Sequence, residues 1–417
     1  MSQIARGASA ALANRDITVP TPLTAEATRI ASIDIFRGLT ILVMVFVNDV
    51  SGVKGLPWWT YHMPENRNGM TYVDMVFPAF LFIVGMSIPL AIRRRIAKGD
   101  TPFRIWRHTI LRSIGLVAMG LLLANQGYVD AQLTGINAWL WDALALAGII
   151  LFWNVYPRSG RFKPLFVILK WTGLALLVWS VIIFKRRTQQ GQVTGLDFSY
   201  LEILGLIGCA YFSVCILYLI LKKNFWVFVF SLSALTALNV ASKIGLTPRL
   251  DQLPNYVWPF ETGALSSITM AGLVASLMFF ENTVARTFKA KAAWALGFAA
   301  ILLGAAWELA PLGISKNLAT PTWCLYSAGV SLLLFLILYW VADVRHATKW
   351  ASFVKPAGSN TLLTYLLPYV CYLTPVVNRI SAYGSEGRVG VVRAVVFTGF
   401  VLALSAVVTR LHLRLQL

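Results

Sequence analysis

The sequence predicts an all-α integral membrane protein, a polytopic bundle of about 12 (10–12) transmembrane helices. Hydrophobic residues make up 58% of the 417 positions, charged residues only 13%, and the mean hydropathy is +0.69. Water-soluble domains carry about 25% charged residues. A helix needs about 20 apolar residues to cross about 30 Å of hydrocarbon, and the chain offers about a dozen runs of that kind.

Each expected span is one apolar run with a short polar connection to the next. The runs cover residues 33–51, 71–92, 105–126, 137–156, 163–184, 200–221, 224–242, 263–280, 291–310, 321–341, 359–378 and 389–411. With an even number of spans, the N-terminal and C-terminal ends of the chain are expected on the same side of the membrane.

Residues 1–29 precede the first span and contain no continuous apolar run. Pro20 and Pro22 stand among small and polar residues there, so we expect a disordered cytoplasmic tail instead of a signal peptide. Residues 30–417 then form a single transmembrane domain.

The distribution of basic residues predicts the orientation. Most of the 36 lysines and arginines fall in connections that are cytoplasmic if the N-terminus is cytoplasmic, with a dense group at Arg93, Arg94, Arg95 and Lys98. Residues 185–187 are an exception on the outer side. Topology and contact with anionic membrane lipids account for the net charge of +19, so we expect lipid partners, no nucleic acid and cytoplasmic termini.

The four cysteines lie inside apolar runs and lack the paired spacing of metal ligands. They are Cys209, Cys215, Cys324 and Cys371. We therefore expect neither a disulfide framework nor a metal site.

Polar side chains gather at the outer ends of the first two spans. The first span ends in "MVFVNDVSG", which contains Asn48, and the second begins in "TYVDMVF", which contains Asp74. The connecting stretch "YHMPENRNG" contains His62. Because the two spans run in opposite directions, all three residues are expected at one membrane face. A carboxylate or amide can orient an imidazole as a general base, but a locally bonded loop histidine and a helix-capping Asp74 fit the pattern too.

Asp34 and Arg37 form a second polar pair, three residues apart at the cytoplasmic start of the first span. An ion pair lowers the cost of placing both charges near lipid. Alternatively, Arg37 points into the bundle and binds an anion such as a phosphate.

These residues belong to longer patterns that resemble a known family. The patterns are "RIASIDIFRGLTILVMVFVN", "NGMTYVDMVFPAFLFIVGMSI", "LRSIGLVAMGLLLANQG", "PLGISKNLATPTWCLYSAG" and "GSNTLLTYLLPY". Together they resemble the heparan-alpha-glucosaminide N-acetyltransferase family and its bacterial NagX-like relatives. The middle departs from it, with "AWLWDALALAGIILFWN" in place of a glycine-valine-leucine-glutamine-arginine stretch, and Ala319 stands where the family usually has Trp.

The resemblance implies a transmembrane acetyltransferase domain over residues 30–417. Such an enzyme moves an acetyl group from cytoplasmic acetyl-CoA to the amine of a glucosamine-type sugar across the membrane. The resemblance makes His62 the catalytic residue, as base or as transient acetyl carrier, and aligns Asn48 with the asparagine that ends the family's first core span. We expect Asp74 to hold the imidazole from its other side. A homodimer in a bacterial inner membrane is a reasonable further expectation.

The two substrates would use residues at opposite faces. For the phosphates of CoA we expect Arg37, Arg93, Arg94 and Arg95, because arginine binds phosphate with two parallel hydrogen bonds. For the acceptor we expect Glu261, Ser315, Lys316 and Asn317, from the loops before the eighth and tenth spans. Lys316 as a snorkelling membrane anchor is the alternative.

Two other functions fit the same composition. A secondary transporter for a sugar or related solute would relay protons through Asp34, Asp74, Glu202 or Glu308. A transmembrane O-acyltransferase would modify a polysaccharide hydroxyl. A transporter places its essential groups near the middle of the bilayer, whereas His62 is expected in a surface loop.

Overall fold

The structure is a computed structural model, and it describes residues 30–157, 159–221, 224–248, 252–254, 257–281, 287–411 and 413–417. The expected tail, residues 1–29, lies outside the described residues.

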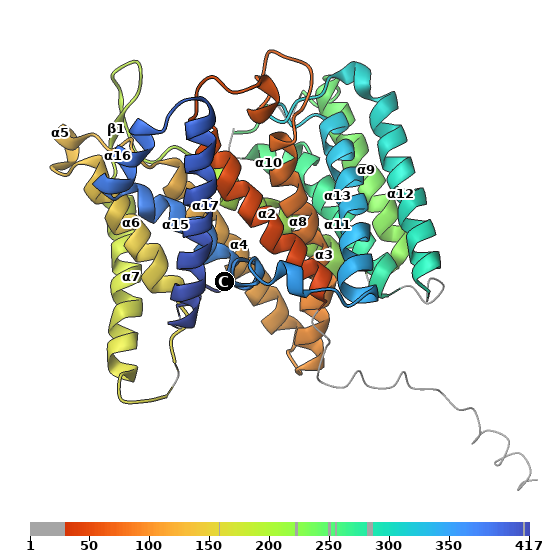
Figure 1. Ribbon diagram of the computed structural model, residues 1–417, viewed down its shortest axis with the longest axis horizontal. Coiled ribbons are helices and arrows are strands. Elements are labelled where there is room, and N and C mark those ends of the chain that lie inside the picture. Colours follow the sequence, from red (N-terminus) through yellow and green to blue (C-terminus); the bar gives the residue numbers. More distant parts are fainter. Residues whose placement is uncertain are drawn as a thin grey trace, which may run out of the picture.

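The described residues form a bundle of long apolar helices (Figure 1). Nine are long and apolar enough to cross a membrane: α2 (Ala31–Val50), α3 (Val76–Ala97) with the preceding turn η2 (Val73–Met75), α4 (Pro102–Ala124), α7 (Lys163–Ile183), α8 (Glu202–Ile220), α9 (Phe225–Lys243), α12 (Phe288–Glu308), α13 (Pro321–Tyr339) and α17 (Gly387–Arg410). Three shorter apolar helices accompany them: α6 (Ala138–Trp153), α11 (Ala264–Phe280) and α15 (Thr361–Tyr372). Each coincides with one expected span, which confirms the all-α membrane bundle.

Short elements connect these helices. They are η1 (Trp58–Thr60), α5 (Ala131–Thr134), α10 (Trp258–Glu261), η4 (Ala310–Leu312), η5 (Trp340–Val344), η6 (Lys349–Ala351), α14 (Lys355–Ser359), α16 (Pro375–Tyr383) and the antiparallel strands β1 (Arg186–Arg187) and β2 (Val193–Thr194).

Several helices begin where the sequence supplies a capping side chain. The side-chain oxygens of Thr101, Asn137, Asn224, Thr287 and Thr320 each accept a hydrogen bond from a backbone N–H in the first turn of the following helix. Such caps satisfy donors that the helix itself leaves open. Thr320 fixes the start of α13 and thereby the loop before it, which enters the site described below.

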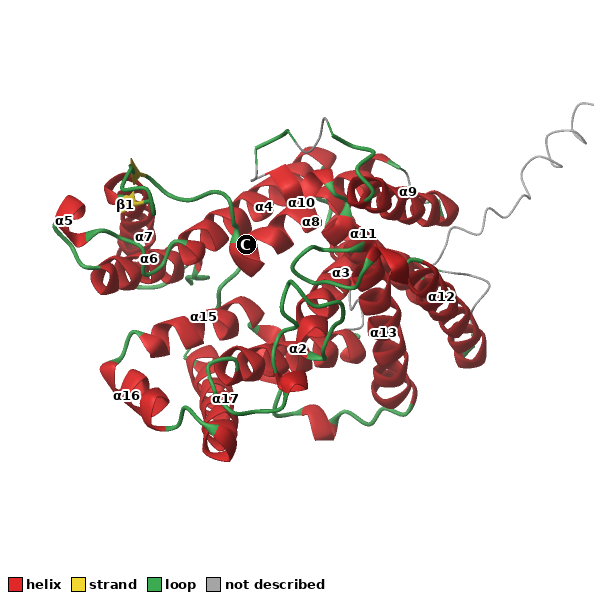
Figure 2. Ribbon diagram, turned by 90° about the horizontal axis from the view of Figure 1, so that it is seen from above, coloured by secondary structure: helices red, strands yellow, loops and turns green. Residues whose placement is uncertain are grey.

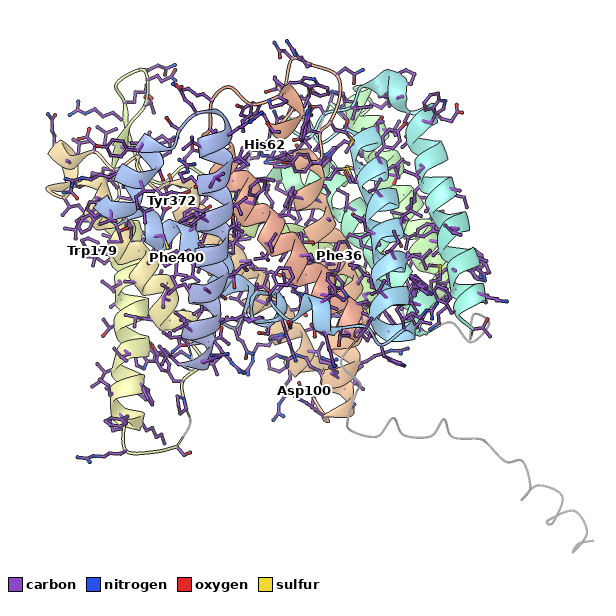
Figure 3. The ribbon with its side chains drawn as sticks, viewed as in Figure 1. Phe36, His62, Asp100, Trp179, Tyr372 and Phe400 are labelled. Atoms are coloured by element: carbon purple, nitrogen blue, oxygen red, sulfur yellow. The ribbon has the colours of Figure 1, made fainter. Side chains whose placement is uncertain are left out.

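The twelve apolar helices within the described residues alternate in direction, so the start of α2 and the end of α17 lie toward the same edge of the bundle (Figure 1). His62 lies at the upper edge and Asp100 at the lower edge (Figure 3). Residues 185–187, the exception to the predicted distribution of basic residues, lie at the upper edge (Figure 1). There Arg186 pairs with Asp197 at 2.7 Å, and Arg187 pairs with Asp130 at 2.8 Å. These carboxylates neutralise two of the charges that oppose the expected orientation.

Helix α11 is the centre of the bundle. Its residues Ala264–Phe279 are all buried, and it packs against α3. A Cβ on Gly85 would overlap the carbonyl oxygen of Thr269, and one on Gly272 would overlap that of Phe82. Small residues of this kind let two helix backbones approach closely inside a membrane, and the contact fixes the middle of α3, the helix that follows the turn carrying Asp74.

Two groups of helices lie on either side of α2 and α3. Seen from above, α9, α11, α12 and α13 stand together at one end, and α6 and α7 stand at the other (Figure 2). Helices α7, α9, α12 and α17 bury only a small share of their residues inside the bundle, as expected for helices that face lipid.

Candidate active site

Two loops that are far apart in the sequence meet at the upper edge of the bundle. The Asn68 side-chain oxygen accepts a hydrogen bond from the Ile314 N–H at 2.7 Å, and the Gly69 N–H donates to the Ile314 carbonyl oxygen at 2.9 Å. These bonds join the connection between α2 and α3 to the connection between η4 and α13. The histidine and lysine predicted from separate patterns are thereby brought to one place.

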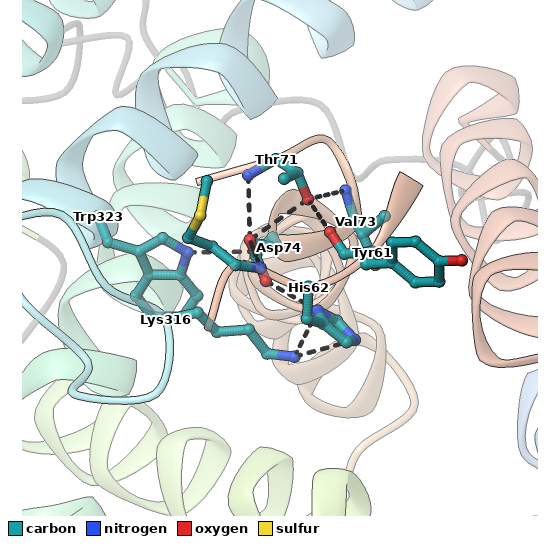
Figure 4. Close-up of polar contacts among 8 residues, drawn as sticks. Tyr61, His62, Thr71, Val73, Asp74, Lys316 and Trp323 are labelled. Carbon is teal, nitrogen blue, oxygen red and sulfur yellow. Dashed lines mark hydrogen bonds and ion pairs between the residues drawn. The ribbon is translucent and has the colours of Figure 1, made fainter. Parts of the chain in front are cut away.

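The centre of this site is an imidazole–carboxylate pair (Figure 4). His62 Nδ1 lies 2.7 Å from Asp74 Oδ1, and the other carboxylate oxygen accepts the backbone N–H groups of Met63 at 3.1 Å and Thr71 at 3.0 Å. The Asp74 side chain is 1% exposed, whereas that of His62 is 38% exposed. The carboxylate is thus fixed inside the protein while the imidazole remains reachable from the upper face.

This arrangement selects one tautomer of His62. When Nδ1 carries the proton and donates it to Asp74, Nε2 holds the lone pair and can accept a proton. The hydroxyl of Thr71 donates to the carbonyl oxygen of Tyr61 at 2.8 Å, which ties the backbone next to His62 to the same turn. An oriented imidazole with an available lone pair is suited to general base catalysis.

Lys316 completes the cluster from the second loop. Its Nζ lies 3.2 Å from Nδ1 and 3.4 Å from Nε2 of His62, so it is placed between the two ring nitrogens and not along one of them. Burial lowers the pKa of Lys316, and the Asp74 carboxylate partly opposes this shift. A lysine held in this way supplies an N–H donor beside the imidazole.

The loop that carries Lys316 is tightly folded. The Ser315 N–H donates to the Thr320 hydroxyl at 3.0 Å, the Ala319 N–H donates to the Lys316 carbonyl oxygen at 3.0 Å, and Ala319 has a φ of 45°. In addition, the indole N–H of Trp323 donates to the backbone carbonyl oxygen of Asp74 at 3.2 Å. The first turn of α13 therefore holds the loop against the His62–Asp74 pair.

Among the described residues, no hydrogen bond joins Asn48 to this cluster. Asn48 is exposed at the end of α2, and within the described ranges its side chain makes no hydrogen bond. Its neighbour Asp49 is buried instead, bonded to the hydroxyl of Tyr372 and paired with Arg393 at 3.0 Å. The catalytic role of Asn48 stays a prediction, and the site-adjacent end of α2 is fixed through Asp49.

The predicted acceptor residues occupy different positions. Ser315 is buried and its hydroxyl accepts the Leu318 N–H at 3.3 Å, so it shapes the loop. Asn317 is exposed beside it, and Glu261 is half-buried at the end of α10. The hydrogen bonds that surround His62 include Lys316 but not these three residues.

A cavity of about 740 Å³ opens on the lower half of the bundle. It is lined by α2, α3, α4, α8 and α15, and its charged lining residues are Asp34, Arg37, Arg94, Arg95 and Arg112, with His108 beside them. Its volume is in the range of small-molecule sites. Because arginines outnumber carboxylates on its wall, the cavity favours an anionic ligand.

Arg93 does not share this cavity with its neighbours. It pairs with Glu281 at 2.5 Å, on the side of α3 that faces α11. Arg37 turns toward the cavity wall, where it lies 3.4 Å from Asp34 and 3.0 Å from the Ser87 hydroxyl. Of the four predicted arginines, the fold therefore gathers three and separates one.

A short segment near the end of the sequence closes one side of the cavity. The Asn360 side chain donates to the carbonyl oxygen of Leu413 at 2.8 Å and accepts the N–H of Leu415 at 3.3 Å. Leu415, Gln416 and Leu417 then line the cavity. The asparagine of the "GSNTLLTYLLPY" stretch thus has a structural role in shaping this wall.

Sequence patterns gave only partial signals for the remaining lining residues. His108 and Arg112, which the sequence did not single out, are four residues apart on one face of α4, and this spacing is the signal that could have found them. The Arg112 guanidinium lies 4.9 Å from the ring centre of Tyr211, a contact between two helices that no local pattern predicts.

A protein-family model described as "Domain of unknown function (DUF5009)" matches residues 29–257, more than half of the chain. The chain belongs to this family. The part shared with the DUF5009 family contains the His62–Asp74 pair and all the cavity arginines, whereas Lys316 comes from beyond the match.

Two curated proteins are similar to this DUF5009 member, and both are named heparan-alpha-glucosaminide N-acetyltransferase. The protein from Mus musculus is 26% identical over 381 residues, which cover 83% of this chain and 54% of the relative. The protein from Homo sapiens is 34% identical over 128 residues, which cover 31% of this chain and 18% of the relative. The chain thus spans about half the length of the mouse relative. These similarities agree with the resemblance seen in the sequence motifs.

Proposed function

We propose that the chain is a transmembrane acetyltransferase that takes its acetyl group from acetyl-CoA and passes it to the amine of an amino sugar. The observation that carries this proposal is the His62–Asp74 pair, 2.7 Å apart, at the end of the bundle opposite the opening of an arginine-lined cavity. The names of the mouse and human relatives support the same reaction.

The cavity is proposed to bind the donor. Arg37, Arg94, Arg95 and Arg112 present guanidinium groups to a common space, and such groups bind phosphate with paired hydrogen bonds. Aromatic and apolar residues on the same wall, including Tyr211, suit the adenine ring and the pantetheine arm. On this proposal the nucleotide binds at the lower edge, which the positive-inside rule predicts to be cytoplasmic.

The upper face is proposed to receive the acceptor. An ammonium group must lose a proton before its nitrogen can attack a thioester carbonyl, and Nε2 of His62 is available to take that proton. Lys316 is an N–H donor next to the imidazole and is suited to stabilise the negative charge that develops on the carbonyl oxygen. Direct transfer and transfer through an acetylated His62 both use this arrangement.

The depth of the cavity fits a donor site below the polar cluster and an acceptor site above it. Of its lining residues on α2 and α3, Met44 and Phe80 are the nearest along their helices to the upper edge. At 1.5 Å per residue, Met44 is about 6 Å below Asn48, and Phe80 about 9 Å below Asp74, along their helices. The acetyl end of a donor bound in the cavity would therefore approach the polar cluster from below, so neither substrate has to cross the membrane.

The test is acetyl transfer by the full-length protein in detergent solution. Wild type, His62→Ala and His346→Ala would be incubated with radiolabelled acetyl-CoA and a panel of amino sugars, since His346 is an exposed histidine far from the site. We expect wild type and His346→Ala to label an amino sugar equally, and His62→Ala to lose a factor of about 10² to 10⁴ in kcat.

The product distinguishes the related reaction on hydroxyl groups. An amide survives mild alkali, whereas an ester is cleaved. Equal labelling by wild type and His62→Ala would refute the catalytic role of the imidazole, and alkali-labile product would replace the amine acceptor by a hydroxyl.

A further inference from the structure

A buried carboxyl group that the proposed reaction has not used lies at the inner end of the cavity. Glu202 is 8% exposed at the start of α8. One carboxyl oxygen accepts the Leu204 N–H at 2.9 Å, and the other contacts the hydroxyls of Tyr365 and, at 3.2 Å, Tyr369. The ion pairs found among the described residues do not include Glu202. Its side-chain partners are therefore hydroxyl groups and not cations.

This carboxyl is connected to the cavity through Tyr365. Tyr365 lines the cavity together with Ile203 and Leu204, the two residues that follow Glu202. The neighbouring wall at this end is formed by apolar side chains such as Met44 and Phe80. A phenol at the apolar end of a ligand site is the kind of placed polar group that orients or reacts with a bound molecule.

The protein keeps Glu202 at an energetic cost. Its backbone has a φ of 52°, in the left-handed region that residues other than glycine seldom adopt. A carboxyl group at membrane depth is also costly, and such residues mark functional sites more often than packing. Both costs fall on the same residue, which indicates a role for the carboxyl itself.

We propose that Tyr365 is the acid that protonates the departing thiolate of the acyl donor, with Glu202, as a carboxylic acid, supplying the proton. This inference rests on the proposed acetyl transfer. When the carbon–sulfur bond breaks, its electron pair leaves with sulfur. The phenol proton of Tyr365 moves to sulfur, and the proton of Glu202 moves to the phenol oxygen. Glu202 remains as a carboxylate held by Tyr369 and Leu204, and it regains a proton from water after the thiol leaves.

The proposal puts one reacting carbon between the base and the acid. The base sits beside the attacking nitrogen and the acid beside the leaving sulfur. Two hydrogen bonds of about 3 Å and two bonds to the carbon together span roughly 9 Å. The inner end of the cavity at Phe80 is about 9 Å below Asp74 along α3. On α15, Tyr365 is about 10 Å below Tyr372, whose hydroxyl contacts Asp49 near the upper edge.

The experiment compares two acyl donors that differ in their need for an acid. Acetyl-CoA releases a basic thiolate, whereas S-(4-nitrophenyl) thioacetate releases a stable one. We expect Tyr365→Phe and Glu202→Gln to lower kcat with acetyl-CoA by about 10² to 10⁴, and to change the rate with the aryl thioester by less than about threefold. Tyr369→Phe is the matched control, because Tyr369 contacts the same carboxyl but does not line the cavity. Its loss with acetyl-CoA should stay below about tenfold.

A double variant provides a second test, for which acetyl-CoA is the only acyl donor needed. Residues that act as one unit are not additive, so Tyr365→Phe combined with Glu202→Gln should be no slower than Tyr365→Phe. Gel filtration and thermal unfolding of each variant establish that it is folded.

Each other result decides against the inference. Equal losses with both donors would make the tyrosine structural, and additive losses in the double variant would separate Glu202 from it. Full activity of Tyr365→Phe with acetyl-CoA would overturn the inference and leave the acetyl transfer intact. A wild type that transfers no acetyl group from either donor would overturn the proposed function and this inference with it.

Discussion

The two polar regions at opposite ends of the bundle are built differently. Around His62, Asp74 and Lys316, backbone N–H groups and side chains from two distant loops hold each group in place. Around the cavity, Arg94 and Arg95 line a large space, and within the described part of the chain Arg95 pairs with Asp100 alone, at 2.9 Å. The His62 region thus has a fixed geometry, whereas the other region is an open cavity with a positively charged wall.

In the proposed reaction, the difference corresponds to two tasks. A base must be held in one orientation when the nitrogen attacks, because small misplacements are costly in rate. A nucleotide must bind and then leave as product, so distributed charge is better suited than a rigid cage. Substitutions at the fixed end should therefore change kcat, and those at the hollow end should change the donor KM.

The largest effect is expected from Asp74→Asn. The amide has one acceptor oxygen for the bonds that the carboxylate receives from His62, Met63 and Thr71, and it no longer fixes the tautomer. We expect kcat at saturating substrates to fall by about 10² to 10⁴. Asp100→Asn is the matched change at the other end and should leave kcat within about twofold. Similar losses of kcat in both variants would remove the contrast.

The next largest effect is a change in the donor KM, which should differ between substitutions of two neighbouring arginines. Arg94→Gln should raise the KM for acetyl-CoA by about tenfold, because a charge-assisted hydrogen bond is worth about 1.5 kcal/mol or more. Arg93→Gln should not raise it, since Arg93 pairs with Glu281 outside the cavity. Initial rates over a range of donor concentrations give both values. A higher KM for Arg93→Gln than for Arg94→Gln would contradict the assignment.

A smaller effect is expected where the two loops are joined. Asn68→Ala removes the hydrogen bond to the Ile314 N–H, worth about 1 kcal/mol, and should lower kcat about fivefold by loosening Lys316. Asn66→Ala, at an exposed position of the same loop, should have no effect. If both variants match wild type, the loop contact is not needed to position the cluster.

The smallest effect concerns stability and pH. Burial holds the pKa of Lys316 below its ordinary value of 10.5. At pH values between the lowered pKa and 10.5, the unfolded chain therefore binds more protons than the folded one. Over that window the unfolding free energy should rise with pH in wild type, relative to Lys316→Met. Thermal unfolding midpoints measured across the alkaline range check the sign. A wild type that loses stability relative to the variant as pH rises would contradict it.

Individual residues show how much of the His62 site could be predicted from sequence patterns. The "TYVD" stretch predicted a polar residue at the upper end of α3, and His62 was placed on the same face by helix direction alone. The alternative of a helix-capping Asp74 is only part of what is seen, because its second oxygen accepts N–H groups from the loop. Lys316 was expected on this face, but its position beside the imidazole depends on the fold of a loop 254 residues away.

The sequence by itself determined the membrane class, the twelve apolar segments and their alternation, because lipid requires about 20 apolar residues per crossing whatever the neighbours are. It also restricted the candidate site residues to two faces of the bundle. Only the tertiary structure decided which side of α3 faces the cavity, and so which of Arg93, Arg94 and Arg95 share it. It likewise decided that Tyr365 and Glu202 meet, since helix packing depends on side chains distant in the sequence, which no local period encodes.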